Sequence, residues 1–207
     1  MLIIYSKKSI MNTLQDNVQK WFELSKTGKF VEAKDFYFDN LFEEIIDNFI
    51  SKTSIRKEVD VLFSVLGFTP EPIILTQRAL NPKTHVIFYT ASNEKNFERE
   101  IVPYLEKFLT SSYKLVELNG EDFDTIFKTM SEEMKLNPAR EYAIDITGGK
   151  KSMVASASIF AKEYNFNVLY VDYSEYNPDL RRPTPGSEIL NWVYDPYVNR
   201  PDLFSFE

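Results

Sequence analysis

The stretch Tyr142-Ala-Ile-Asp-Ile-Thr-Gly-Gly-Lys-Lys-Ser-Met153 decides the fold that we predict for this chain. It opens with an apolar strand, breaks at two consecutive glycines, and resumes as a helix rich in Ala, Ser and Met. Glycines let a backbone approach a ligand closely, and the free N–H groups and dipole of a helix N-terminus favour an anion. Lys150 and Lys151 add two cations there. The stretch predicts a phosphate site, although an ordinary strand-to-helix turn with solvated lysines has the same pattern.

Two common nucleotide motifs are absent from this stretch. The spacing G-x-x-x-x-G-K-[ST] of a P-loop does not occur, and neither does the dinucleotide pattern G-x-G-x-x-G. The nature of the phosphate ligand must therefore be inferred from other parts of the chain.

Composition narrows the possible functions. The 207 residues suffice for one domain with an appendage or for two small domains. A net charge of −7 argues against coating of long nucleic acid. One histidine and no cysteine argue against a zinc site, rule out disulfides and suit a reducing cytoplasm, where we expect the protein. Leu2-Ile-Ile-Tyr5 is too short to span a membrane, and we expect no metal or cofactor.

The first part of the chain reads as helical. Residues 1–10 suggest a short tail or edge segment. Residues 11–52 carry apolar side chains three and four apart, interrupted at Thr27-Gly28-Lys29, which predicts a helical hairpin whose apolar face needs a cover. Residues 52–58 look like a polar linker. We therefore expect an N-terminal helical segment, residues 1–55, and a second domain, residues 56–207.

From residue 59 onward, apolar strands alternate with helices. The predicted strands span 59–66, 85–90, 113–118, 142–146 and 167–172, and the predicted helices span 73–80, 94–109, 122–134 and 151–164. This alternation predicts an α/β fold with a Rossmann-like, doubly wound, mostly parallel sheet. Ligands of such sheets lie beyond the carboxyl ends of the strands, so we expect loops 67–72 and 147–151 to face one site.

The end of the chain has a different character. Residues 174–185 contain several prolines and predict an extended loop with two arginines. Residues 187–193 suggest a last strand that is antiparallel to the others. Residues 196–207 suggest an irregular tail.

Three stretches together resemble one family, the CRISPR-associated Rossmann fold (CARF) domain, a sensor of type III CRISPR systems. They are Gly67-Phe-Thr-Pro-Glu-Pro72, Asp145-Ile-Thr-Gly-Gly-Lys-Lys-Ser-Met153 and Arg182-Pro-Thr-Pro-Gly-Ser-Glu188, and the similarity covers about residues 59–200. Their order and their places on the predicted elements make the set more specific than any single stretch.

The resemblance implies a homodimer that binds a cyclic oligoadenylate across its two-fold axis, with cyclic tetraadenylate as the first candidate and the hexamer as the second. It also implies a set of ligand-binding residues. These are Phe68 and Thr69 for ribose and phosphate, Ser92 and Asn93 for base or ribose, Thr147, Gly148, Gly149, Lys150 and Lys151 for phosphate, and Arg181 and Arg182 to close over the ring. For the arginines, a solvated loop is an equal alternative.

Several readings of the output stay open. Some similar domains are metal-independent ring nucleases that cut their ligand; in that case Thr69 would orient the ribose and Lys151 would stabilise the charge that develops. The residues show neither the Arg-x-x-x-x-His pair of a HEPN ribonuclease nor a restriction-type metal site. The helical segment is then a dimerising or partner-docking element, or the effector is a separate partner. A Rossmann-like interaction module unrelated to CRISPR is a further alternative, and a DNA-binding regulator is disfavoured because no helix has a basic face.

Overall fold

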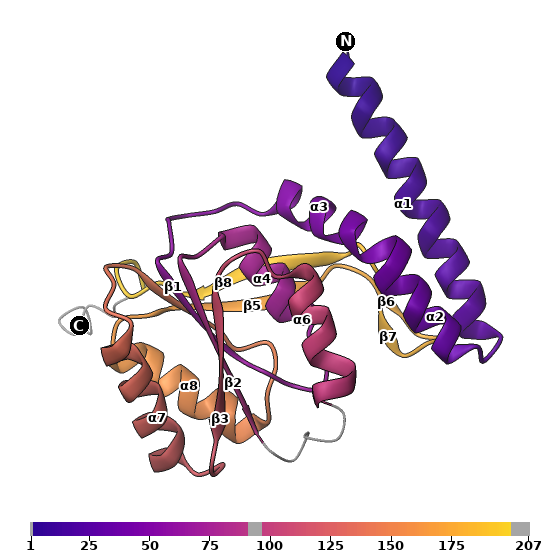
Figure 1. The fold of residues 1–207 in the computed structure, drawn as a ribbon. Coiled ribbons are helices and arrows are strands. Elements are labelled where there is room, and N and C mark those ends of the chain that lie inside the picture. The colour runs from indigo at the N-terminus through magenta and orange to yellow at the C-terminus, as the bar shows by residue number, and fades with distance from the viewer. Residues whose placement is uncertain (1, 91–96, 200–207) are drawn as a thin grey trace, which may run out of the picture. The chain divides into compact units, whose positions relative to one another are not determined.

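The computed structural model describes residues 2–90 and 97–199, and the side chains from residue 14 onward within those ranges. The chain divides into two compact units (Figure 1). The first unit comprises residues 1–53 and 172–189, and the second comprises residues 54–171 and 190–207. The break at residues 53 and 54 lies next to the predicted boundary, but residues 172–189 return to the first unit.

Helices make up the N-terminal part of the first unit. They are α1 (Leu2–Lys26), α2 (Phe30–Phe36), the π-helical turn η1 (Tyr37–Leu41) and α3 (Phe42–Lys52). Gly28, with φ of +76°, lies in the predicted break between α1 and α2. The predicted helices over 11–52 are therefore confirmed. The expectation of a tail over residues 1–10 is wrong, because α1 begins at residue 2 and runs through them.

The apolar face of these helices is covered. Its buried members are spaced as expected for one face of successive helices: Trp21, Phe38, Leu41, Phe42, Ile45, Ile46 and Phe49. Tyr37 joins Trp21, Phe38 and Phe42 through ring contacts with centroids 5.1–6.2 Å apart. Core packing thus accounts for this apolar pattern.

Residues 172–189 complete the first unit. They form a short antiparallel hairpin of β6 (Tyr176–Asn177) and β7 (Arg182–Pro183), where an extended loop was predicted. The Asn48 amide donates to the carbonyl of Gly186 at 2.8 Å, and Arg182 lies over the Trp21 ring at 5.5 Å. These contacts tie the hairpin to the N-terminal helices.

The second unit contains the predicted sheet. Its strands are β1 (Val61–Val65), β2 (Thr84–Thr90), β3 (Tyr113–Leu118), β4 (Tyr142–Asp145), β5 (Asn167–Tyr173) and β8 (Glu188–Tyr194). They lie in the order β3-β2-β1-β4-β5-β8, and the first five are parallel to their neighbours. Ser174, just after β5, donates its N–H to the carbonyl of Ser187, just before β8, so β8 runs back antiparallel. The Rossmann-like prediction is confirmed.

Helices cover both faces of this sheet (Figure 1). On one face, α7 (Phe123–Leu136) and α8 (Lys151–Glu163) bury a large core with Phe63, Phe88 and Phe160. On the other face lie α4 (Glu71–Leu80) and α6 (Val102–Phe108), the latter preceded by the π-helical turn η3 (Phe97–Ile101). Burial on both faces explains why the strand sequences are almost continuously apolar.

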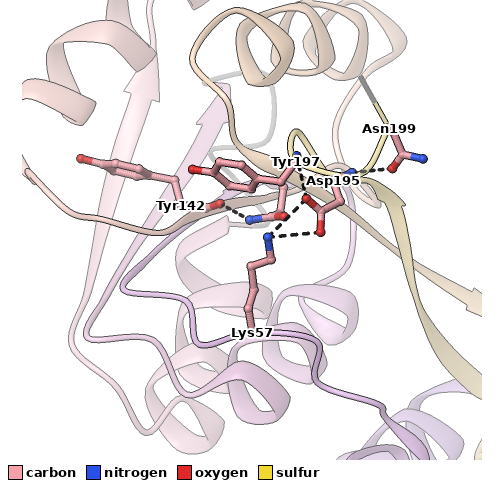
Figure 2. A network of polar contacts seen from close by, with 6 residues as sticks. Lys57, Tyr142, Asp195, Tyr197 and Asn199 are labelled. Atoms are coloured by element: carbon pink, nitrogen blue, oxygen red, sulfur yellow. Dashed lines mark hydrogen bonds and ion pairs between the residues drawn. The ribbon is translucent and has the colours of Figure 1, made fainter. Parts of the chain in front are cut away.

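A polar cluster fastens the end of β8 to the linker before β1 (Figure 2). The ammonium of Lys57 lies 3.1 Å from a carboxylate oxygen of Asp195, and it also lies 4.6 Å from the centre of the Tyr197 ring. Burial would raise the pKa of Asp195, but the Tyr197 N–H and Lys57 hold it below its usual range. The side chain of Asn199 accepts from the Asp195 N–H at 2.8 Å. Asp195 therefore serves as a charged anchor for the segment after the last strand.

Candidate functional site

The loops after β1 and β4 meet at the carboxyl edge of the sheet. These strands are adjacent in the middle of the sheet, and the chain winds outward from them in opposite directions. The loops touch through their backbones. A Cβ atom on Gly148 would lie 2.4 Å from the carbonyl oxygen of Val65 and 2.7 Å from the nitrogen of Gly67. Only glycine fits this contact, so the expectation that the two loops come together at one place is confirmed.

The loop after β4 leads into an open helix N-terminus. Gly149 adopts φ of +80°, a left-handed conformation that favours glycine. Helix α8 then begins at Lys151, with Lys150 as its N-cap, no side-chain hydrogen bond to the cap and no acidic residue in its first turn. The first N–H groups of a helix have no partner within the helix, and the helix dipole is positive there. This end of α8 has the chemistry of an anion site.

The two lysines of this loop differ in their surroundings. Lys150 makes an ion pair with Glu121, which precedes α7. Lys151 is exposed, and it makes no ion pair within the described part of the chain. Lys151 is therefore the more available cation, whereas Lys150 must leave Glu121 before it can contact another anion.

The loop after β1 presents two exposed side chains. Phe68 is 83% exposed and Thr69 is also exposed, while Leu66 and Pro70 on either side are buried. A fully exposed aromatic ring next to an anion-friendly helix start suits a ligand that combines phosphate with a flat or apolar group.

Sequence reasoning missed a buried carboxylate beneath the loops. Asp145, the last residue of β4, is 1% exposed and accepts hydrogen bonds from the Thr147 N–H at 2.9 Å and the Thr147 hydroxyl at 2.5 Å. The hydroxyl of Thr76 in α4 also donates to it, at 2.9 Å. Burial raises the pKa of Asp145 to about 6, against the lowering effect of these hydrogen bonds. Its position at the end of a strand, before Thr147 and the glycines, was the available signal.

The remaining predicted ligand residues are not brought to these loops. Ser92 and Asn93 lie outside the described residues. Arg181 and Arg182 belong to the first unit, where Arg182 packs on Trp21. Their assignment as ligand contacts stays a prediction.

The single histidine has a structural environment. His85, near the start of β2, is fully buried and lies 2.8 Å from the Ser64 hydroxyl through its Nε2. Burial lowers the pKa of His85 to about 3, so the ring is neutral. It cannot act as a base at the opposite end of the strands.

Two searches of the described residues gave no site. No group of three or more His, Cys, Asp or Glu side chains in residues 2–90 and 97–199 is placed to hold a metal ion. In the same part of the chain, the length and apolar character of every helix fall short of what crossing a membrane requires.

Comparison with known proteins gave one significant sequence relative among curated proteins. The CRISPR system endoribonuclease Csm6 of Thermus thermophilus is 26% identical over 137 residues, which is 64% of this chain and 28% of the relative. This chain therefore spans well under a third of that protein's length. No family model matches the chain.

Solved structures with a related arrangement are more distant. Can2 from Sulfobacillus thermosulfidooxidans, solved in complex with cyclic tetra-adenylate, covers 62% of this chain and 34% of its own, with 18% identity and a TM-score of 0.46. Enterococcus italicus Csm6 bound to cyclic hexa-2'-fluoro-hexa-dAMP covers 56% and 34%, with 18% identity and a TM-score of 0.43. Protein VC1899 from Vibrio cholerae covers 54% and 30%, with 11% identity and a TM-score of 0.43.

The sequence relative is itself a CRISPR system protein, and the similarity accompanies the predicted sheet and the three motifs. The resemblance is thereby confirmed: the chain is related to the CRISPR-associated Rossmann fold proteins of type III CRISPR systems.

Proposed function

We propose that this chain is a sensor of type III CRISPR signalling that binds a cyclic oligoadenylate, cyclic tetraadenylate in the first place, at the loops after β1 and β4. The observation that carries the proposal is the backbone contact of these loops through Gly67 and Gly148, beside the open N-terminus of α8. The similarity to a CRISPR system protein supports the same ligand class.

The geometry assigns a role to each group. The N–H groups around Gly148 and Gly149 and the ammonium of Lys151 would bind phosphate, because preorganised donors and a cation both favour an anion. The exposed ring of Phe68 would contact a base or ribose, and Thr69 would hydrogen-bond the sugar or phosphate.

Two copies of the chain would share one ring. A ring of identical AMP units has rotational symmetry, and a two-fold dimer can give it the same contacts from each protomer. We therefore propose a homodimer with one ring on its axis. Binding would then be passed to the first unit of this chain or to an effector partner.

Isothermal titration with cyclic tetraadenylate and cyclic hexaadenylate tests the proposal, with linear oligoadenylates of equal length as ligand controls. We expect binding of one ring per two chains, and a dimer mass by light scattering. Lys151→Ala should weaken binding about tenfold or more, because an ion-assisted hydrogen bond to phosphate is lost. Lys162→Ala is the matched control, since it removes an exposed lysine in the last turn of the same helix.

No heat with either ring at micromolar protein would reject the proposal. Equal losses from Lys151→Ala and Lys162→Ala would reject the location of the site. The ring should be recovered intact after incubation in EDTA; its cleavage would instead favour the ring nuclease.

A further inference from the structure

The hydroxyl of Thr147 is held between two strands beneath the candidate site. It donates to the carboxylate of Asp145 at 2.5 Å, and it accepts the N–H of Val171 in β5 at 2.7 Å. Both partners are buried. A threonine hydroxyl has one proton and two lone pairs, so these two contacts use its proton and fix its orientation.

This hydroxyl continues the pairing of β4 with β5 past the end of β4. The last backbone bond of the pair runs from the Ile146 N–H to the Leu169 carbonyl, at 3.0 Å. The chain then turns toward Gly148, while β5 continues to Tyr173. The Thr147 side chain thus provides the acceptor for the next inward N–H of β5, which would otherwise be buried without a partner.

Asp145 connects the same residue to the other loop. Its second oxygen accepts the hydroxyl of Thr76 in α4, the helix that follows the loop with Phe68 and Thr69. The loop after β4, the helix after β1 and the end of β5 are therefore joined through one carboxylate and one hydroxyl. Val171 is also the last residue of the second unit before the chain enters the first unit.

We propose that Thr147 is a positioning residue: it sets the Gly148–Lys151 loop for the phosphate through Asp145 and couples that loop, through Val171, to the segment that leads into the first unit. This inference rests on the proposed function for the identity of the ligand. It gives Thr147 a different role from direct ligand contact. A phosphate that pulls on the Gly148 and Gly149 amides would displace the residue just before them, and with it the start of the segment 172–189.

Thr147→Val tests the proposal because it keeps the shape of the side chain and removes the hydroxyl. In the full-length protein without ligand, we expect the Val171 amide to exchange its hydrogen about tenfold faster or more, since its acceptor is gone. Binding of cyclic tetraadenylate should weaken about tenfold. Thr147→Ser should restore both properties. Thr129→Val in α7 is the control, because it removes a hydroxyl that donates only to the Thr125 carbonyl of its own helix.

The coupling has its own readout. At saturating cyclic tetraadenylate, the exchange of residues 171–189 should change in the wild-type protein and not in Thr147→Val. Unchanged Val171 exchange in the unliganded variant, or equal affinities of the variant and the wild type, would overturn the proposal. No ligand effect on residues 171–189 in a wild-type protein that binds the ring would overturn the coupling. Failure of the wild type to bind any ring would reject the proposed function, while the exchange of the unliganded variant would still test the role of Thr147.

Discussion

The replacement Asp145→Asn should change how the stability of this protein depends on pH. Burial raises the pKa of Asp145 to about 6 in the folded chain, against an ordinary value of 3.8. The folded state therefore holds this proton more tightly than the unfolded state does. Stability from this group is greatest in acid and falls as the pH rises through the window from about 4 to about 6.

The size of the effect follows from the two pKa values. One pKa unit corresponds to about 1.36 kcal/mol, so the ionised Asp145 lowers the free energy of unfolding by about 3 kcal/mol relative to its neutral form. Asparagine copies the neutral form. Its oxygen can accept both bonds from Thr147, and its NH₂ group can donate to the Thr76 hydroxyl, which is free to turn round.

Urea unfolding between pH 4 and pH 8 measures this. The chain has two tryptophans, Trp21 and Trp192, and a Trp21→Phe background leaves the one in the second unit as the reporter. We expect the stability of Asp145→Asn relative to the wild type to rise by about 3 kcal/mol from pH 4 to pH 7. A difference that stays constant over this range, or that changes in the opposite direction, would refute the reasoning, because the other titrating groups are common to both proteins.

Three further outcomes are expected. Glu121→Gln should release Lys150 and tighten the binding of cyclic tetraadenylate about two- to fivefold at low salt, the range for a half-exposed ion pair; weaker binding in a titration would contradict this. Gly148→Ala should lower the free energy of unfolding by about 1–3 kcal/mol, because two backbone atoms of the neighbouring loop occupy the place of its methyl group; an unchanged urea midpoint would show that the loops can separate freely. Lys57→Met should cost about 3 kcal/mol by leaving the buried Asp195 unpaired, and Asp195→Asn in the same background should recover part of that loss, whereas no recovery would mean that the cost is one of packing.

The sheet and the meeting of its loops could be predicted because the relevant signals are local. Apolar strands, helix periodicity and the glycine turns follow from neighbouring residues, and topology rules then place the ends of β1 and β4 together. Gly67 and Gly148 are predictable in this way, since tight turns at strand ends need small residues. The start of α1 was missed because Leu2-Ile-Ile-Tyr5 has β-branched and aromatic residues that do not favour a helix.

The contacts beneath the site were out of reach because they depend on tertiary packing. Thr76, Asp145 and Val171 are separated by 69 and 26 residues, and nothing in the local sequence of α4 indicates a bond to the end of β4. The place of residues 172–189 is a similar case. Their prolines indicate an extended loop, but the contacts of Gly186 with Asn48 and Lys52 are set by a helix more than a hundred residues earlier.

The discontinuous first unit has a practical consequence for dissecting the protein. The polypeptide crosses from one unit to the other three times, after residues 53, 171 and 189. Deleting the N-terminal helices would strip the hairpin of Asn48, Lys52 and Trp21, and would leave a strand-to-strand connection with exposed apolar and polar groups that evolved to be covered. A soluble fragment for ligand studies would have to lose both pieces together, with residues 172–187 replaced by a short turn from β5 to β8.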